Sequence, residues 1–198
     1  ISSPTSLRNP MKTEIFHIDG PVLLTATVHR DRRGAFSESY NAARFHEALG
    51  FTPDFVQDNL SVSEDTGTLR GLHLQTPPAA QAKLVSCVKG EILDIAVDVR
   101  KGSSTYGEHI SVSLSGHDGQ SLWIPEGFLH GFITRTPATI ISYKVTAHYS
   151  RDCDVSVMWN DPDLAIDWEP GKTAPILSNK DANALKFSTF ETPFAVAS

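Results

Sequence analysis

The chain has 198 residues and is acidic, with 17 Lys and Arg against 23 Asp and Glu and a formal net charge of −6. A nucleic-acid-binding surface needs a clustered basic face, so this balance argues against nucleic acid as a partner. No stretch approaches the roughly 18 consecutive apolar residues of a membrane span, and the first thirty residues carry no signal-peptide pattern. Cys87 lies in an apolar strand pattern, which favours a buried free thiol, so we expect a cytoplasmic protein.

Residues 1–10 are polar and rich in turn-forming residues ahead of Met11. We expect this segment to be a leader outside the fold. A chain of this length buries roughly 70% of its unfolded surface. Residues 11–198 are therefore predicted to form one domain.

The N-terminal region predicts short strands and then a helix. Residues 15–28 carry short apolar groups around Gly20-Pro21, which indicates two strand pieces or an edge hairpin. Gly34 is the predicted turn of residues 30–40. Asn41 is a plausible N-cap for a helix that reaches Leu49 and stops at Gly50.

From residue 55 onward the hydrophobic period is two, which is typical of β-strands. One strand starts at Leu69 and must stop at Pro77-Pro78, because proline cannot donate to a ladder. The turn at Lys89-Gly90 joins residues 84–88 to the next strand, and Asp118-Gly119 is a hairpin signal into residues 122–124. Three further sets alternate: Leu93, Ile95, Val97 and Val99 opposite Ile92, Asp94, Ala96 and Asp98; Ile110, Val112 and Leu114; and Ile141, Tyr143, Val145, Ala147 and Tyr149.

Many short strands with Gly and Pro turns, and no alternating strand–helix rhythm, predict an all-β sandwich or barrel. After Trp168 the chain becomes a loop, and a second short helix is expected to follow Ser178. The helices are therefore predicted to be few, short and peripheral.

The stretch T-L-R-G-L-H-L-Q-T-P-P-A-A-Q-A-K presents Arg70, His73 and Lys83, which suit anion binding and proton transfer. Strict alternation would place Arg70 and His73 on opposite faces, and a bulge at Gly71 could bring them together. A later stretch reads W-I-P-E-G-F-L-H-G-F and contains the pattern P-x-G-x-x-H. Jelly-roll barrels use this pattern to point a histidine into the mouth of the barrel, and here that histidine is His130. We expect the two stretches to face one another across a pocket.

Each of these residues also has an ordinary structural interpretation. His73 could be satisfied by a backbone carbonyl, and Lys83 could extend its ammonium to water from a strand end. Tyr143 could be a core tyrosine that needs only a hydroxyl partner. Asp181 could be the N3 carboxylate of a helix capped by Ser178, although its second oxygen would remain free for another role.

Metal-binding barrels of this kind carry a His-x-His pair, but here the second position is Gln75. His73 and His130 alone make a poor site for a divalent cation, so no metal is predicted.

A dense series of motifs then resembles one family. In order they read D-x-R-G-x-F-x-E-S-Y, F-V-Q-D-N, L-R-G-L-H-x-Q, Q-x-K-L-V, G-E-I-x-D-I-A-V-D-V-R-K-G-S, L-W-I-P-E-G-F-x-H-G-F, W-N-D-P-D-L-x-I-x-W and L-S-x-K-D. Together they cover nearly all of residues 31–181 and resemble the dTDP-4-dehydrorhamnose 3,5-epimerase family. The resemblance implies a cupin-type jelly-roll barrel, a homodimer that exchanges N-terminal strands, and catalysis without metal or other cofactor.

The resemblance also implies roles for individual residues. His73 matches the general base, Asp181 the carboxylate that polarises it, Tyr143 the proton donor on the opposite face of the sugar, and Lys83 the group beside the C4 ketone. Further substrate-binding positions match Arg70, Gln57, Asn59, His130 and Lys180, with Asp154 where a glutamate near the nucleotide is common. The family positions that contact the nucleotide across the dimer match Arg33, Phe36 and Glu38.

The implied activity is epimerisation at C3, C5 or both of a dTDP-4-keto-6-deoxyhexose. Ala35, Leu74 and Leu129 depart from the family pattern but leave the catalytic set whole. A single-position epimerase is the nearest alternative. A metal-dependent cupin enzyme and a non-catalytic sugar-nucleotide-binding barrel are more remote ones.

Overall fold

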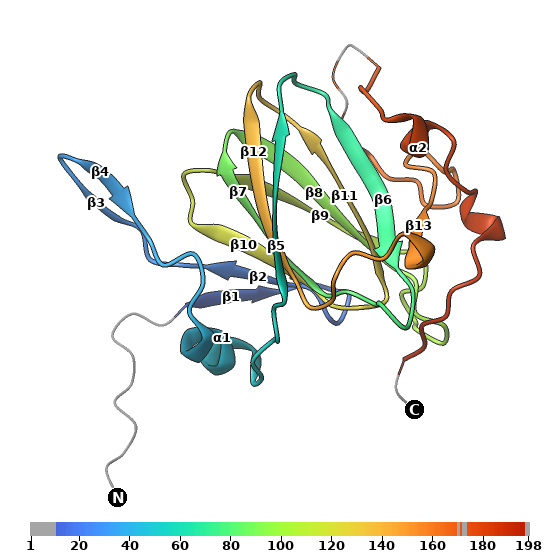
Figure 1. Cartoon of the computed structure of the whole chain (residues 1–198), viewed down its shortest axis with the longest axis horizontal. Helices are drawn as coiled ribbons and strands as arrows, with labels where there is room; N and C mark the ends of the chain where they lie inside the picture. Colours follow the sequence, from blue (N-terminus) through green and yellow to red (C-terminus); the bar gives the residue numbers. More distant parts are fainter. Residues whose placement is uncertain (1–10, 170, 172–173, 197–198) are drawn as a thin grey trace, which may run out of the picture.

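The computed structural model describes residues 11–169, 171 and 174–196. The predicted leader, residues 1–10, lies outside the described residues. Two antiparallel sheets face each other and enclose a central hydrophobic cluster, which confirms the predicted all-β jelly-roll barrel (Figure 1). The six-stranded sheet has the order β1-β2-β10-β7-β12-β5, and the five-stranded sheet has the order β13-β6-β11-β8-β9.

The strands are β1 (Lys12–Ile15), β2 (Val22–Thr25), β3 (His29–Asp31), β4 (Gly34–Phe36), β5 (Gln57–Ser63), β6 (Leu69–Gln75), β7 (Lys83–Lys89), β8 (Glu91–Asp98), β9 (His109–Ser115), β10 (Gln120–Ile124), β11 (Phe128–Thr134), β12 (Thr139–Val145) and β13 (Asp154–Ser156). The α-helices are α1 (Ala42–Leu49) and α2 (Asn179–Ala182), and short 3₁₀ turns lie at Arg151–Cys153 and Phe187–Thr189. Among the described residues, no helix is long and apolar enough to cross a membrane.

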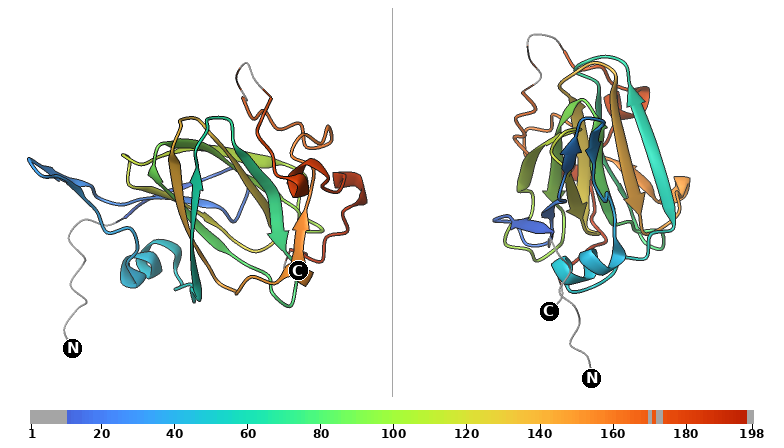
Figure 2. Two further views of the ribbon diagram at one scale, coloured as in Figure 1. Left: turned by 45° about the horizontal axis from the view of Figure 1, so that its top comes forward. Right: turned by 90° about the vertical axis from the view of Figure 1, so that its left-hand side faces the viewer.

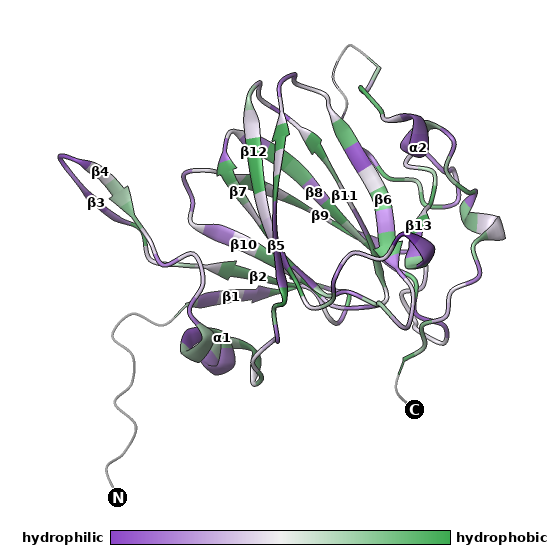
Figure 3. Ribbon diagram, in the orientation of Figure 1, coloured by the Kyte–Doolittle hydropathy of each residue, from purple (hydrophilic) through white to green (hydrophobic). Residues whose placement is uncertain are grey.

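Of the two alternatives left open for residues 15–28, the edge hairpin forms, and the predicted turn at Gly34 joins a second pair of strands. β1 pairs with β2 at the edge of the six-stranded sheet, on either side of the Gly20-Pro21 turn. β3 and β4 pair only with each other and form an arm that projects from the body in Figures 1 and 2. Figure 3 shows a hydrophilic tip on this arm, and every residue of both strands is exposed.

Helix α1 has the predicted ends. The Asn41 side chain accepts hydrogen bonds from the backbone N–H groups of Ala43 and Arg44, which the first turn leaves without an internal partner. Gly50 ends the helix in a left-handed conformation, with φ of 79°. The helix buries Phe45 against Trp123 and covers part of the outer face of the six-stranded sheet.

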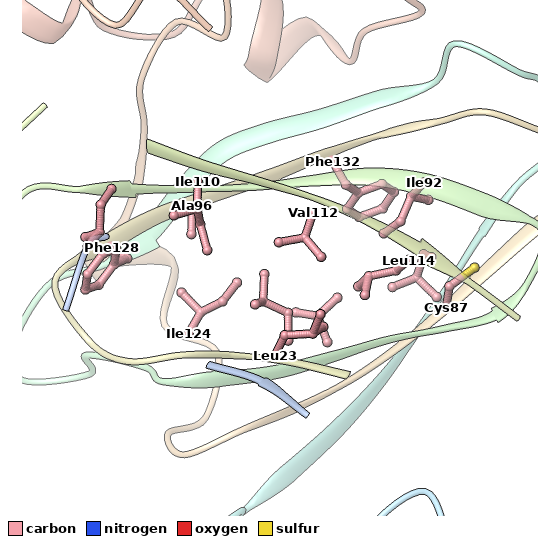
Figure 4. Close-up of a cluster of buried hydrophobic side chains, with 14 residues drawn as sticks. Leu23, Cys87, Ile92, Ala96, Ile110, Val112, Leu114, Ile124, Phe128 and Phe132 are labelled. Atoms are coloured by element: carbon pink, nitrogen blue, oxygen red, sulfur yellow. The ribbon is translucent and has the colours of Figure 1, made fainter. Parts of the chain in front are cut away.

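Strand β8 explains why the fold has two apolar layers. Ile92 and Ala96 belong to the cluster between the sheets, part of which Figure 4 shows. The opposite row, from Leu93 to Val99, packs under the C-terminal segment with Trp168. Because both faces are covered, the strand is buried along almost its whole length.

Two predicted turns connect the expected strands, but the connected strands do not pair with each other. Asp118-Gly119 was predicted as a hairpin signal, but β9 pairs with β8, whereas β10 pairs with β2 and β7. Lys89-Gly90 likewise joins β7 of one sheet to β8 of the other. A tight turn determines where the chain reverses. In a two-layer fold the reversed strand can enter the facing sheet instead of pairing with its predecessor.

The bulge proposed at Gly71 is present. On β11, His130 faces His73 and Phe132 faces Arg70. The step from Arg70 to His73 is three residues long on β6, whereas the facing step on β11 is two residues long, so β6 carries one extra residue. Gly71 has φ of 135°, and a Cβ there would lie 2.5 Å from the Cα of Gly131. Glycine is therefore required on steric and conformational grounds, and the bulge turns Arg70 and His73 to the same side.

Candidate active site

A cavity of about 410 Å³ opens at one end of the barrel. Its walls come from both sheets and from the segment that leads into α2. The polar residues that line it include Arg70, His73, Lys83, His130, Tyr143 and Asp181. The structure therefore brings six of the thirteen predicted site residues to one cavity.

His73 and Asp181 form a hydrogen-bonded pair, with His73 Nε2 2.5 Å from Asp181 Oδ1. The second carboxylate oxygen, Oδ2, accepts a hydrogen bond from Ser178 Oγ at 2.9 Å. The Asp181 backbone N–H donates to the same hydroxyl at 3.1 Å, so Asp181 is also the N3 residue of a capped helix, as the structural interpretation predicted. With Nε2 donating to the carboxylate, Nδ1 of His73 keeps its lone pair and can accept a proton.

Burial opposes the charged form of Asp181, but hydrogen bonds from His73 and Ser178 and the charges of His73 and Lys180 together lower the pKa of this carboxyl. Asp181 is only 3% exposed. An ionised, buried carboxylate next to a histidine holds one tautomer and favours the imidazolium that forms when the base accepts a proton.

His130 is paired with a carboxylate that the sequence analysis did not single out. Its Nε2 lies 2.7 Å from Asp94 Oδ1, and Asp94 is completely buried. Burial lowers the pKa of His130, and the attraction of Asp94 offsets this only in part. His130 is therefore a neutral hydrogen-bonding group at neutral pH, held in orientation by Asp94.

Lys83 lies among these groups on β7, and its side chain lines the cavity as its strand parity predicted. Burial lowers the pKa of the Lys83 ammonium to about 8, against the opposing attraction of Asp94 and Asp154. A cation in a poorly hydrated site interacts strongly with any negative charge that develops beside it.

Tyr143 and Arg70 approach the cavity from opposite sheets. Tyr143 lies on β12, and burial raises the pKa of its phenol, which keeps the hydroxyl protonated. The Arg70 guanidinium on β6 donates to Val62 O at 3.2 Å and contacts Ser63 Oγ at 3.4 Å. Tyr143 therefore faces His73 from the other sheet, and Arg70 is held in place by the end of β5.

A polar cluster lies beside the cavity. Lys180 Nζ is 2.5 Å from Asp154 Oδ2, which also accepts a hydrogen bond from Tyr149 OH at 3.1 Å. On β5, Gln57 Nε2 donates to Asn59 Oδ1 at 2.7 Å. These four predicted binding residues pair with one another or with neighbours and do not line the cavity itself.

The remaining three predicted binding residues lie on or beside the β3–β4 arm. Arg33 pairs with Asp31 at 2.5 Å, and Phe36 is 68% exposed. Glu38 follows β4 and pairs with Arg44 of α1 at 3.1 Å. Within one chain, these residues do not reach the cavity.

The cavity thus holds a base on one sheet, and a phenol and a partly buried cation on the other. This arrangement suits removal of a proton from a carbon next to a carbonyl and its return from the opposite side. Among the described residues, no group of three or more His, Cys, Asp or Glu side chains is arranged to hold a metal ion.

A family model described as dTDP-4-dehydrorhamnose 3,5-epimerase matches residues 15–189. The chain belongs to this epimerase family. It is 44% identical over 179 residues to the dTDP-4-dehydrorhamnose 3,5-epimerase of Shigella flexneri, covering 90% of this chain and 96% of the relative.

Solved structures agree with this membership. The dTDP-6-deoxy-D-glucose-3,5-epimerase of Legionella pneumophila, in complex with dTDP-4-keto-L-rhamnose, is 41% identical with a TM-score of 0.89 and covers 94% of this chain and 100% of its own. A 3'-monoepimerase from Streptomyces bikiniensis, in complex with dTDP-quinovose, is 34% identical with a TM-score of 0.82 and covers 88% and 87% of the two chains.

For this epimerase-family chain, sequence reasoning missed three polar residues of the site: Asp94, Ser178 as a partner of Asp181, and Tyr149 at the polar cluster. Asp94 had a signal, because it lies between Ile92 and Ala96 on one face of a predicted strand. A buried carboxylate needs a partner, and in this barrel the partner is His130. The apolar wall from Phe132, Ile176 and Leu177 was also not predicted.

The pKa of Lys83 predicts the alkaline side of the pH profile. Because the value is about 8, the ammonium loses its proton as pH rises through that point, and kcat/KM should fall above it. Lys83→Arg should move any such fall to higher pH, because a guanidinium stays charged. The measurements are kcat/KM against pH for both proteins and NMR titration of the Lys83 ammonium. A Lys83 that stays protonated well above pH 9 would contradict the prediction.

Proposed function

We propose that this chain is an isomerase that epimerises C3 and C5 of dTDP-4-dehydro-6-deoxy-D-glucose to give dTDP-4-dehydro-L-rhamnose. The observation that carries the proposal is the pairing of His73 with Asp181 on one wall of the cavity, with Tyr143 and Lys83 on the wall from the other sheet. Membership of the epimerase family and the similarity to a protein in complex with dTDP-4-keto-L-rhamnose support the substrate.

In this mechanism His73 removes the proton from a carbon next to the C4 ketone. The electrons of the broken C–H bond move into the ring and onto the ketone oxygen, forming an enolate. Asp181 stabilises the imidazolium that results. The ketone accepts the electrons, so the proposal requires no redox cofactor.

The enolate needs a positive partner, and Lys83 is the proposed one. Stabilisation of a developing oxyanion is commonly the largest single contribution in such sites, and burial of Lys83 increases it. His130, held neutral by burial and oriented by Asp94, is proposed to bind a sugar oxygen.

Tyr143 is proposed to return a proton to the carbon from the face opposite His73, which inverts the centre. Its raised pKa keeps a proton available at neutral pH, and the phenolate that forms can be reprotonated by solvent. The same cycle at the second carbon completes the reaction, and its net result exchanges two carbon-bound hydrogens with water.

The diphosphate and the nucleoside need cations and polar groups at the cavity mouth. Arg70 and Arg33 are proposed to contact the diphosphate, because guanidinium pairs well with phosphate oxygens, and the Lys180 ammonium is proposed as a further cation there. Gln57, Asn59 and Asp154 are proposed to bind the sugar nucleotide beside them. Lys180 Nζ pairs with Asp154 Oδ2, so contact with the diphosphate would draw the lysine away from this carboxylate.

The last three predicted residues, Arg33, Phe36 and Glu38, are proposed to serve the site of a partner subunit in a homodimer that exchanges N-terminal strands. Two features support this. The β3–β4 arm projects from the body with Phe36 exposed. The outer face of β5 and β7 leaves Leu60, Val62 and Val88 at least 49% exposed, and a second copy could cover these side chains.

One alternative is favoured by a specific observation. The similarity to a 3'-monoepimerase is compatible with a variant of the reaction in which only one carbon is inverted. The number of deuteriums that enter the product from heavy water distinguishes the two, because a double epimerase incorporates two. The metal-dependent cupin and the non-catalytic barrel remain testable by metal analysis and by turnover, and cytoplasmic localisation stays a prediction.

His73→Asn should abolish exchange at both C3 and C5, because it removes the base. General acid–base groups typically contribute about 10²–10⁴-fold. The measurement is deuterium incorporation into dTDP-4-dehydro-6-deoxy-D-glucose, with binding of the substrate followed separately. Exchange near the wild-type rate in a variant that binds normally would remove His73 from the role.

Tyr143→Phe removes only a hydroxyl and should pack as before. Proton removal by His73 should survive, so deuterium should still enter at C5 but with retention of configuration. C3 could be less affected if water reaches that face. Inversion of C5 at an undiminished rate would show that another group donates the proton, and loss of both exchange and inversion would assign Tyr143 to substrate orientation.

Mixing subunits tests the shared site. An Arg33→Ala chain and a His73→Asn chain should form mixed dimers in which one site carries both changes and the other carries neither. Activity should then partly return, whereas each variant alone is impaired. Mixed dimers that form, as shown by mass spectrometry, without recovery of activity would place Arg33 in its own subunit's site or in none.

A further inference from the structure

The hydroxyl of Ser178 lies behind the His73–Asp181 pair, on the far oxygen of the carboxylate. Ser178 Oγ is 2.9 Å from Asp181 Oδ2 and accepts the Asp181 backbone N–H at 3.1 Å. An ionised carboxylate can only accept, so the serine must donate its one proton to Oδ2. The direction of both hydrogen bonds is therefore determined.

The two oxygens of Asp181 thus have different partners. Oδ1 faces His73 Nε2 at 2.5 Å, and Oδ2 faces the serine hydroxyl. The side chain is 3% exposed, so solvent contributes little to its orientation. Rotation of the carboxylate about its terminal bond would break both contacts at once.

We infer that Ser178 is a positioning residue for catalysis: its hydroxyl holds the plane of the Asp181 carboxylate so that Oδ1 meets His73 Nε2 and Nδ1 is presented as the base. This inference rests on the proposed function of His73. It assigns to Ser178 a role beyond that of the N-cap of α2, although the same atom performs both.

The simpler explanation is that Ser178 only caps the helix. Lys180 lies on the same four-residue helix and is a proposed diphosphate contact. A cap that fails would let the helix shift, which should raise KM through Lys180. Loss of the link to Asp181 should instead lower kcat, because it acts on the base. The two explanations therefore predict different kinetic constants.

The pH profile provides a second distinction. Without the serine donor, the carboxylate can turn away from His73 Nε2, so Asp181 stabilises the imidazolium less. The base then gains its proton only at lower pH, and the acidic limb of kcat/KM moves downward. Other charged or titratable groups near His73 lie on β6, β7, β11, β12, β13 and α2: Arg70, Lys83, His130, Tyr143, Asp154 and Lys180. All of them are unchanged in a Ser178 variant.

The experiment compares Ser178→Ala, Ser178→Gly and Ser178→Thr. Glycine has no hydroxyl but is tolerated at an N-cap nearly as well as serine. Alanine has no hydroxyl and is also a poor N-cap. Threonine keeps the hydroxyl. We expect kcat for exchange to fall by about 10-fold or more in both the Ala and Gly variants, as for other hydrogen bonds that orient a catalytic group from behind. The Thr variant should stay near wild type.

Thermal unfolding of the same proteins separates stability from catalysis. Both variants lose a hydrogen bond to a buried carboxylate, and the Ala variant also loses a good N-cap, so Ala should be less stable than Gly. Ala and Gly should share the lower kcat and the downward shift of the acidic limb. If Gly instead matches wild type in kcat and pH profile, or if the Ala variant changes only KM and melting temperature, Ser178 is a helix cap and the inference is wrong.

The ¹⁵N chemical shifts of the His73 ring in the unliganded protein make the test independent of turnover, because they show which ring nitrogen carries the proton. Wild type should hold the Nε2–H tautomer and the Gly variant should populate both tautomers, and an unchanged tautomer in the Gly variant would overturn the inference. If wild type itself fails to exchange deuterium into the substrate, the proposed function fails, whereas the effect of Ser178 on His73 can still be measured.

Discussion

The site depends on one local constraint, the bulge in β6 at Gly71. A regular strand would turn Arg70 and His73 to opposite faces of the sheet, one into the cavity and one away from it. The extra residue brings both to the cavity, and it requires a glycine because φ is 135° and the backbone of β11 at Gly131 leaves no room for a Cβ. The same close approach brings β11 beside β6, so that His130 faces His73 across the ladder. One residue that carries no chemistry thus decides which side chains can act together.

The second organising principle is the pairing of charges in a poorly hydrated space. Each histidine of the cavity has its own buried carboxylate, Asp181 for His73 and Asp94 for His130. The two pairs differ in accessibility, because His73 is 28% exposed while His130 is almost fully buried. A base must reach its substrate and its protonated form must be stabilised, whereas a hydrogen-bonding group needs only a constant orientation. The environment, more than the residue type, separates the two roles.

The barrel also leaves surfaces that one chain does not complete. The C-terminal segment covers the outer face of the five-stranded sheet with Trp168 and Phe190, whereas α1 covers only part of the other outer face. Leu60 and Val62 of β5 remain exposed on the less covered sheet, and the β3–β4 arm projects from the body (Figure 1). These features are consistent with the proposed homodimer, in which the arm would supply residues that the cavity of a single chain lacks.

The sequence by itself determined the local features. Alternating apolar positions predicted the strands, Asn41 and Gly50 predicted the ends of α1, and Ser178 predicted the start of α2, because these signals depend on hydrogen bonds and conformations within a few residues. Motif resemblance supplied the family and a list of site residues. The tertiary structure decided the pairings across the chain: that β9 and β10 enter different sheets, that Asp94 meets His130, and that Ser178 bonds the carboxylate facing His73. Asp94 and Asp98 occupy the same row of one strand, yet one pairs with a histidine of the cavity and the other with Arg100. Their partners differ because a buried charge bonds to whichever group the fold brings beside it, and periodicity along one strand carries no information about that neighbour.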